Sequence, residues 1–276
     1  MKTWLITGCS SGIGRGIAKA ALEKGYNVVV TARNIETVKP LADEYPDRAL
    51  AAALDVTDKE SIAAAVGAAT KRFGGVDALV NNAGYGYRSA IEEGEEEDIE
   101  TLFKTNLFGP VELIKAVLPQ MRERKSGAII NLSSIGAVRS AVGSGYYSAT
   151  KAALELLSDA LKKEAEPLGI KVMIVEPGAF RTRFFDTSLK GARIKIDDYA
   201  ETAGKNRKEN IVNKFDQPGD PEKAGRLIVD TIEKDEYPER LLMGSDAVEV
   251  VGTELRNRLK ELERWETASR TTDFLE

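Results

Sequence analysis

The sequence contains no histidine and only one cysteine, Cys9. Without an imidazole, a Ser-His-Asp triad, a Cys-His pair and the usual histidine-ligated zinc sites are impossible. A single cysteine excludes an internal disulfide and a cysteine-rich zinc site, and we expect no metal centre. Acid–base chemistry near neutral pH must therefore come from tyrosine, lysine, aspartate, glutamate or this one thiol.

Long apolar runs and basic clusters are also missing. No stretch of about 18 uncharged apolar residues is present, so we predict no membrane span. The N-terminus, MKTWLITG, runs straight into a predicted strand and lacks the features of a secretory leader, so we expect a cytoplasmic protein. The net charge of −5, with no cluster of lysine and arginine, argues against binding of nucleic acid.

Short apolar runs alternate with segments of helical apolar spacing. Because these runs are continuous rather than alternating, we expect strands that are buried on both faces of a parallel sheet. This order predicts an α/β fold: a single doubly wound Rossmann-type domain over residues 1–276, with a central, mainly parallel sheet of about seven strands flanked by helices. The expected strands are 3–7, 27–32, 49–54, 78–81, 128–133, 171–176 and 240–244, and the expected helices are 13–24, 58–72, 98–122, 148–165 and one after Ser245.

Two local features concern helix starts. Thr57, with Glu60 three residues later, predicts a capping box at the start of the second long helix. The acidic run EEGEEED, residues 92–98, is typical of a solvated loop that leads into the first turn of a helix, where acidic side chains are favoured.

A glycine-rich turn, TGCSSGIG at residues 7–14, follows the first strand and opens a helix. Such a turn lets backbone N–H groups approach a pyrophosphate at the positive end of the helix dipole. A glycine turn that merely packs is the alternative. At the end of the second strand, Ala32 stands where NAD enzymes carry an acid, and Arg33 follows it. A cation there favours a 2′-phosphate, and hence NADP(H) over NAD(H), unless Arg33 is simply a surface residue.

The stretch GYYSATK, residues 145–151, carries two adjacent tyrosines and a lysine. Lys151 lies four positions after Tyr147, so on a helix these two side chains share a face, whereas Tyr146 points about 100° away. A free phenol titrates near pH ~10, and an ammonium one turn away favours the phenolate. For an isolated pair, a packed tyrosine with its lysine in solvent would be the alternative.

Three further polar segments follow predicted strands: DVT at 55–57, NNAG at 81–84 and NLSS at 131–134. Parallel sheets bind ligands at the carboxyl ends of their strands. Together with the glycine loop and YSATK, these segments resemble the short-chain dehydrogenase/reductase family, in its shorter oxidoreductase branch. The resemblance covers residues 3 to about 182.

The resemblance implies roles for individual residues. Tyr147 is the proton donor or acceptor, and Ser134, which precedes it by the family's usual 13 residues, orients the substrate oxygen. Lys151 binds the nicotinamide ribose and lowers the pKa of the tyrosine. Asn106 maintains a water-linked proton path, unless it is a helix-packing amide. The residues implied to bind the cofactor are Gly8, Ser10, Ser11, Gly12, Ile13, Gly14, Arg33, Asp55, Val56, Asn81, Ala83, Gly84, Tyr147, Lys151, Pro177, Gly178, Phe180 and Thr182.

These roles predict an NADP(H)-dependent carbonyl reductase or alcohol dehydrogenase, which moves hydride between the nicotinamide and a ketone, aldehyde or secondary alcohol. The alternative is a non-catalytic dinucleotide-binding redox sensor, although a sensor needs no proton machinery. Family members generally form dimers or tetramers, so we expect a homodimer or homotetramer through helices 98–122 and 148–165.

The segment 180–218 is expected to form a substrate lid. Its aromatic side chains favour an apolar or aromatic carbonyl substrate, and its cations favour a negatively charged group. Packing of the lid on the body is the alternative role for the same side chains. The residues expected here are Phe184, Phe185, Tyr199 and Phe215, with Arg181, Arg183, Lys190 and Arg193, and with Tyr85, Tyr87 and Val142 completing the pocket wall.

Overall fold

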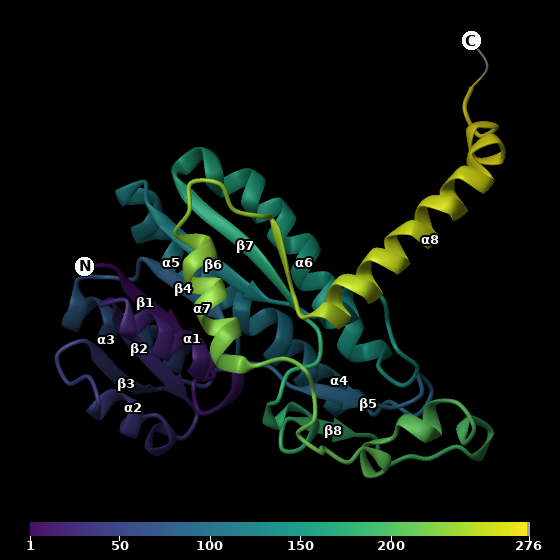
Figure 1. Ribbon diagram of the computed structural model, residues 1–276, viewed down its shortest axis with the longest axis horizontal. Helices are drawn as coiled ribbons and strands as arrows, with labels where there is room; N and C mark the ends of the chain where they lie inside the picture. Colours follow the sequence, from purple (N-terminus) through teal and green to yellow (C-terminus); the bar gives the residue numbers. More distant parts are fainter. Residues whose placement is uncertain (275–276) are drawn as a thin grey trace.

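A computed structural model describes residues 1–274 (Figure 1). Its centre is a seven-stranded sheet in the order β3-β2-β1-β4-β6-β7-β9, and every neighbouring pair is parallel. All seven predicted strands are confirmed, with ends that shift by a single residue. The strands are β1 Thr3–Ile6, β2 Asn27–Ala32, β3 Ala49–Ala53, β4 Ala78–Asn81, β6 Gly127–Leu132, β7 Ile170–Pro177 and β9 Arg240–Met243.

Helices cover both faces of this sheet, as predicted for a doubly wound fold. Trp4 and Ile6 pack on the side of α1 and α7, while Leu5 packs on the side of α3, α5 and α6. Burial on both faces explains why the strands read as unbroken apolar runs. No helix within residues 1–274 is long and apolar enough to cross a membrane. The α-helices are α1 Gly12–Glu23, α2 Lys39–Asp43, α3 Lys59–Phe73, α4 Glu96–Phe103, α5 Gly109–Arg124, α6 Gly145–Ala165, α7 Pro221–Ile232 and α8 Ser245–Arg270.

The strand order reverses at β1, which pairs with β2 on one side and β4 on the other. Chain connections leave the sheet in opposite directions at this point and open a crevice at the carboxyl ends of the strands. The glycine-rich turn follows β1 directly, so the fold places it at the mouth of that crevice.

The predicted helix 98–122 is wrong as a single element. The structure has two α-helices there, α4 and α5, joined by a stretch of π-helix over Lys104–Phe108. A π-helical stretch carries one extra residue per turn and often marks functional positions. Apolar periodicity cannot reveal it, because the segments on either side keep their helical spacing.

The predicted capping box at Thr57 is also wrong. The helix α3 begins one residue later, and its N-cap is Asp58, whose carboxylate accepts the Glu60 N–H at 2.9 Å. Thr57 instead donates its hydroxyl to Asp55 at 2.7 Å. Both threonine and aspartate are good N-caps, and here Asp55 occupies the threonine hydroxyl.

A second, two-stranded parallel sheet was not predicted. It joins β5, Gly86–Arg88, to β8, Leu189–Gly191, which is part of the segment 180–218. This small sheet lies away from the main sheet (Figure 1). The two ends of that segment also meet, because Phe180 bridges Gly219 and the Arg181 N–H donates to the Gly219 carbonyl at 2.9 Å.

The acidic run 92–98 is more than the solvated loop that its composition suggests. Its last three residues occupy the first turn of α4, as predicted, but Glu93 is fully buried. The Glu93 carboxylate pairs with Arg207 and accepts the Ile196 N–H at 3.0 Å. The neighbouring Glu92 and Glu95 bind Tyr199 and Arg193 of the same segment. The run therefore anchors the segment 180–218 to the body.

Electrostatics of Glu93 explain how a buried carboxylate is tolerated there. Burial alone would raise its pKa, but hydrogen bonds from Arg207 and from two backbone N–H groups outweigh burial and lower the pKa to about 2. A depressed pKa means that the anchor stabilises the fold above the ordinary carboxyl pKa near 4.5. That stabilisation is lost as the pH falls from about 4.5 toward 2.

Glu93→Gln is expected to loosen the segment 180–218 at neutral pH, because Arg207 then loses its carboxylate. Hydrogen exchange at the Ile196 amide should accelerate roughly tenfold or more, since exchange reports local opening. Glu92→Gln is the matched control, because Glu92 is exposed and binds only the Tyr199 hydroxyl. Equal exchange in the two variants would contradict the anchor. In the wild-type protein, exchange at Ile196 should rise on acidification below about pH 4.5, with correction for the intrinsic rate.

Candidate active site

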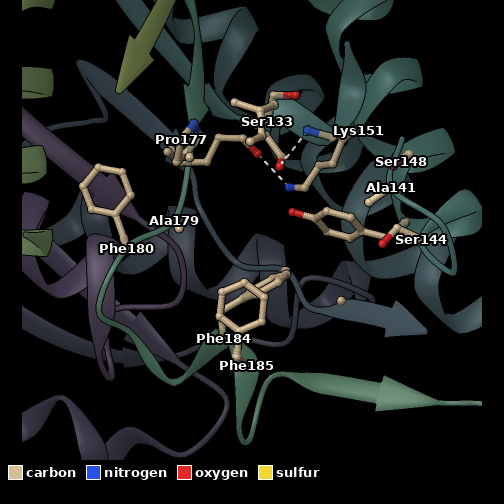
Figure 2. A pocket seen from close by; sticks show the side chains of 18 of the residues that line it. Ser133, Ala141, Ser144, Ser148, Lys151, Pro177, Ala179, Phe180, Phe184 and Phe185 are labelled. Atoms are coloured by element: carbon tan, nitrogen blue, oxygen red, sulfur yellow. Dashed lines mark hydrogen bonds between the residues drawn. The ribbon is translucent and has the colours of Figure 1, made fainter. Parts of the chain in front are cut away.

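A cavity of about 310 Å³ opens at the carboxyl ends of β4, β6 and β7. Ser133 and Ser134 follow β6, the stretch from Pro177 to Phe180 ends β7, and Tyr147 and Lys151 reach it from α6. Figure 2 shows Phe184 and Phe185, from the segment 180–218, on the side opposite Ser133 and Lys151. Residues far apart in the sequence thus meet because all strands end at the same edge.

Tyr147 lies with its phenol beside Ser134. Burial raises the pKa of the Tyr147 phenol, while hydrogen bonding with the Ser134 hydroxyl and the positive charge of Arg88 act in the opposite direction. The Ser134 oxygen also accepts the Gly136 N–H at 3.1 Å, which fixes the position of the serine. One face of the tyrosine ring packs on Phe184, with ring centroids 5.6 Å apart.

Lys151 is a buried cation close to that phenol. Its Nζ donates to the Leu132 carbonyl at 2.7 Å and lies 6.0 Å from the centre of the Tyr147 ring. Burial lowers the Lys151 pKa to about 8, and the negative charge of Glu155 opposes that shift. Glu155 is itself held by the Ser133 hydroxyl at 2.5 Å. The two serines after β6 therefore have different partners. Ser134 hydrogen-bonds with the Tyr147 phenol, and Ser133 donates to the Glu155 carboxylate.

Tyr146 points away from the cavity, as the helical spacing predicts. Its hydroxyl donates to the Ile91 carbonyl at 2.7 Å, and its ring lies edge-on to Tyr87. Tyr147 and Lys151 both line the cavity, and α6 begins at Gly145, so the two residues lie one turn apart on one face.

Asn106 is buried in the π-helical stretch, outside the cavity wall. Its amide oxygen accepts the Tyr85 N–H at 3.1 Å, and its amide nitrogen donates to the Tyr85 carbonyl at 2.9 Å and to Thr150 at 3.3 Å. Asn106 thus holds the connection between β4 and β5 against α6. A water-linked proton path through this amide remains a prediction.

The glycine loop has the geometry of a backbone cradle. Gly8 has φ of +71°, in the left-handed region that favours glycine. A Cβ at Gly14 would lie 2.3 Å from the Asn82 side chain, which clamps the loop by donating to the Thr7 and Gly8 carbonyls. Ser11 is the N-cap of α1 but makes no side-chain cap bond, so the helix start offers its N–H groups to a ligand. The loop therefore fits a phosphate group.

Other predicted residues fall into three groups. Arg33 follows β2 and its charge acts on Asp55, which follows β3, so the two lie near one another at the carboxyl edge of the sheet. Asn81 is buried and donates to Asn131 at 2.8 Å, away from the cavity. The predicted cofactor residues that line the cavity itself are Ile13, Gly84, Tyr147, Lys151, Pro177, Gly178, Phe180 and Thr182.

The pocket wall differs in part from expectation. Tyr87, Phe184 and Phe185 line the cavity, as predicted. Tyr85 and Val142 are not among its lining residues, and Tyr199 and Phe215 lie in the outer part of the segment 180–218. Arg88 on β5 and Asp246 on α8 also line the cavity, although neither belongs to a motif that predicts a site. Their positions depend on a small sheet and a helix packing that no local motif signals.

A family model described as short chain dehydrogenase matches residues 2–192. The chain belongs to the short-chain dehydrogenase family. It is 35% identical over 269 residues to oxidoreductase BOA17 of Botryotinia fuckeliana, covering 97% of this chain and 98% of that protein. It is 38% identical over 242 residues to a 3-ketodihydrosphingosine reductase of Bacteroides thetaiotaomicron, covering 87% of each.

Solved structures of this family share the fold. A short-chain dehydrogenase from Streptomyces avermitilis is 46% identical, with a TM-score of 0.91 over 99% of this chain and 98% of that one. An alcohol dehydrogenase from Thermococcus sibiricus, complexed with 5-hydroxy-NADP, is 26% identical, with a TM-score of 0.72 over 88% and 96%. A 3-ketoacyl-(acyl-carrier-protein) reductase from Brucella melitensis, complexed with NADH, is 27% identical, with a TM-score of 0.74 over 88% and 96%. This short-chain dehydrogenase is an oxidoreductase with one doubly wound domain.

Proposed function

We propose that this short-chain dehydrogenase is an NADP(H)-dependent oxidoreductase that interconverts a ketone or aldehyde and the corresponding alcohol. The observation that carries the proposal is the convergence of Tyr147, Ser134 and Lys151 on one side of a single cavity, next to the stretch that ends β7. Solved relatives bound to NADP-type and NADH cofactors support a nicotinamide dinucleotide. When bound, this cofactor supplies or accepts the hydride.

The three side chains divide the remaining work. The protonated phenol of Tyr147 gives its proton to the carbonyl oxygen during reduction, and the burial that raises its pKa keeps that proton in place at neutral pH. The Ser134 hydroxyl donates a hydrogen bond to the same oxygen as negative charge develops there. Lys151, held by the Leu132 carbonyl, binds the nicotinamide ribose and provides the positive charge that favours the phenolate after proton transfer.

The glycine loop and Arg33 together favour NADP(H). The start of α1 binds the pyrophosphate through its N–H groups, and Pro177, Gly178, Phe180 and Thr182 enclose the nicotinamide end. Arg33 is exposed directly after β2, where its guanidinium reaches a 2′-phosphate. Ala32 leaves this position without the acid that would bind a 2′-hydroxyl and repel the phosphate.

The segment 180–218 serves as the substrate lid in this proposal. Phe184, Phe185 and Leu189 give the cavity an apolar wall facing Tyr147. The nicotinamide would take part of the cavity of about 310 Å³, and the space that remains suits a small substrate with an apolar or aromatic body.

Tyr147→Phe should lower kcat by roughly 10²–10⁴-fold, because the proton donor is removed while the ring still packs on Phe184. NADPH consumption with a panel of ketones and aldehydes measures the rate, and fluorescence titration of NADPH should give a nearly unchanged Kd. Tyr146→Phe is the matched control and should be mild, since its hydroxyl binds the Ile91 carbonyl outside the cavity. Equal losses in the two variants would refute the assignment, and no turnover by the wild-type protein despite tight NADPH binding would favour a redox sensor.

Arg33→Asp should shift the preference from NADPH toward NADH, because a carboxylate repels the 2′-phosphate and accepts the 2′-hydroxyl. The ratio of kcat/KM for NADPH over NADH should fall roughly 10- to 100-fold, the range for hydrogen bonds to charged groups. Arg15→Asp, another basic residue of the glycine-loop region, controls for a general loss of charge. An unchanged ratio in Arg33→Asp would show that Arg33 does not bind the 2′-phosphate.

We further propose a homo-oligomer in which α5 and α6 of two copies pack together. Leu156 on α6 is 71% exposed, and Phe108 at the start of α5 is 55% exposed. Large apolar side chains exposed together on neighbouring helices are typical of protein interfaces. The occupant that we assign to this face is a second copy of the chain.

Leu156→Glu should convert the oligomer to a monomer, because a charge would be buried at the centre of the contact. Light scattering coupled to gel filtration measures the mass. Leu227→Glu on α7, which lies on the other face of the sheet and is 43% exposed, is the control and should keep the wild-type mass. A monomeric wild-type protein, or an unchanged mass in Leu156→Glu, would contradict this interface.

A further inference from the structure

Among the residues that the structure describes, no carboxylate pairs with Arg88, a partly exposed cation in the wall of the cavity. It ends β5 and lines the same space as Tyr147 and Ser134. Its Nε is buried and has no hydrogen-bond partner. Burial lowers its pKa, and the neighbour that acts in the opposite direction is the Tyr147 phenol rather than a carboxylate.

Three cations of the segment 180–218 are satisfied in a different way. Arg207 pairs with Glu93, Arg193 with Glu95, and Lys195 with Glu209. Taking a guanidinium out of water is unfavourable unless an anion or several hydrogen bonds compensate it. Among residues 1–274, no carboxylate pairs with Arg88, and the guanidinium, which is partly exposed to the cavity, can bind an anion that comes from outside the chain.

The position of Arg88 identifies which molecule would bring that group. The cofactor phosphates belong at the glycine loop and at Arg33, on the β1 and β2 side of the crevice. Arg88 lies instead on the small sheet formed with β8, beside the phenol that faces the reacting carbonyl. An anion bound at Arg88 would therefore belong to the substrate rather than to the cofactor.

We propose that Arg88 binds a carboxylate of the substrate, so that this dehydrogenase prefers oxo acids with an apolar or aromatic body over neutral ketones. The planar guanidinium matches a carboxylate with two parallel hydrogen bonds. Phe184, Phe185 and Leu189 enclose the apolar body. This inference rests on the proposed oxidoreductase function and names its substrate class.

The alternative role for Arg88 is purely electrostatic, through its effect on the Tyr147 phenol. The two roles differ in what the substrate must carry. A guanidinium that only adjusts the phenol affects every carbonyl substrate alike. A guanidinium that binds a carboxylate affects acids far more than their esters.

The test compares benzoylformate and 3-benzoylpropionate with their methyl esters, in the wild-type protein and in Arg88→Met. Loss of the guanidinium should lower kcat/KM for at least one acid roughly 10- to 100-fold more than for its ester, chiefly through KM. Arg88→Lys, which keeps the charge without the fork, should fall between the two. Lys190→Met, a neighbour on β8, removes a charge from the same small sheet and should leave the acid-to-ester ratio at the wild-type value, because the Lys190 ammonium lies over the Tyr85 ring, 5.1 Å from its centre, and does not line the cavity.

Equal losses for acid and ester, or no loss for either, would overturn the assignment of Arg88 while the proposed function stands. If the wild-type protein reduces none of the four compounds, the proposed function fails on this panel, and calorimetric titration of the NADPH-bound protein decides the role of Arg88. Tighter binding of benzoate than of benzamide, abolished in Arg88→Met, would support the carboxylate site. Equal binding of the two compounds would overturn it. Thermal melting and NADPH affinity of each variant establish that it is folded.

Discussion

Parallel alignment of all seven strands is the constraint on which the site depends. Because every strand runs in the same direction, the segments that follow β1, β4, β6 and β7 emerge at one edge of the sheet. The glycine loop, Ser134 and Pro177 are brought together by topology alone. The helix α6 then adds the phenol and the ammonium from one face. Reversing any one of β1, β4, β6 or β7 would move the segment that follows it to the opposite edge of the sheet.

The sequence predicted the parts whose physics is local. Continuous apolar runs identified all seven strands of the main sheet, and the i to i+4 spacing of Tyr147 and Lys151 correctly placed Tyr146 outside the cavity. The errors arose where neighbouring polar side chains compete and where segments far apart in the sequence make contact. Asp58 rather than Thr57 caps α3, because Asp55 binds the threonine hydroxyl. The buried Glu93 and the cavity-lining Arg88 depend on contacts with residues about a hundred positions away in the chain, which no local pattern encodes.

The lysine and arginine side chains around the cavity differ in what their positive charges contact. The cations in the outer part of the segment 180–218 pair with the acidic run and contribute to attachment. Lys151 is a buried cation held by a backbone carbonyl, with Glu155 one turn further along α6. Arg88 differs because no carboxylate among residues 1–274 pairs with it. The surroundings of each cation thus decide its role. The cations paired with the acidic run attach the segment, Lys151 takes part in the proposed proton transfer, and Arg88 is the proposed group that recognises the substrate.

The segment 180–218 is fastened at three places. Its ends are joined where Phe180 meets Gly219, its strand β8 pairs with β5, and its far part is held by the buried Glu93. A segment held at these three places has little freedom to swing outward as a rigid body. Adjustment is then confined to the short stretch between Phe180 and β8, which includes Phe184 and Phe185. The fold consequently favours discrimination by the size and shape of what enters, rather than wholesale closure around whatever has bound.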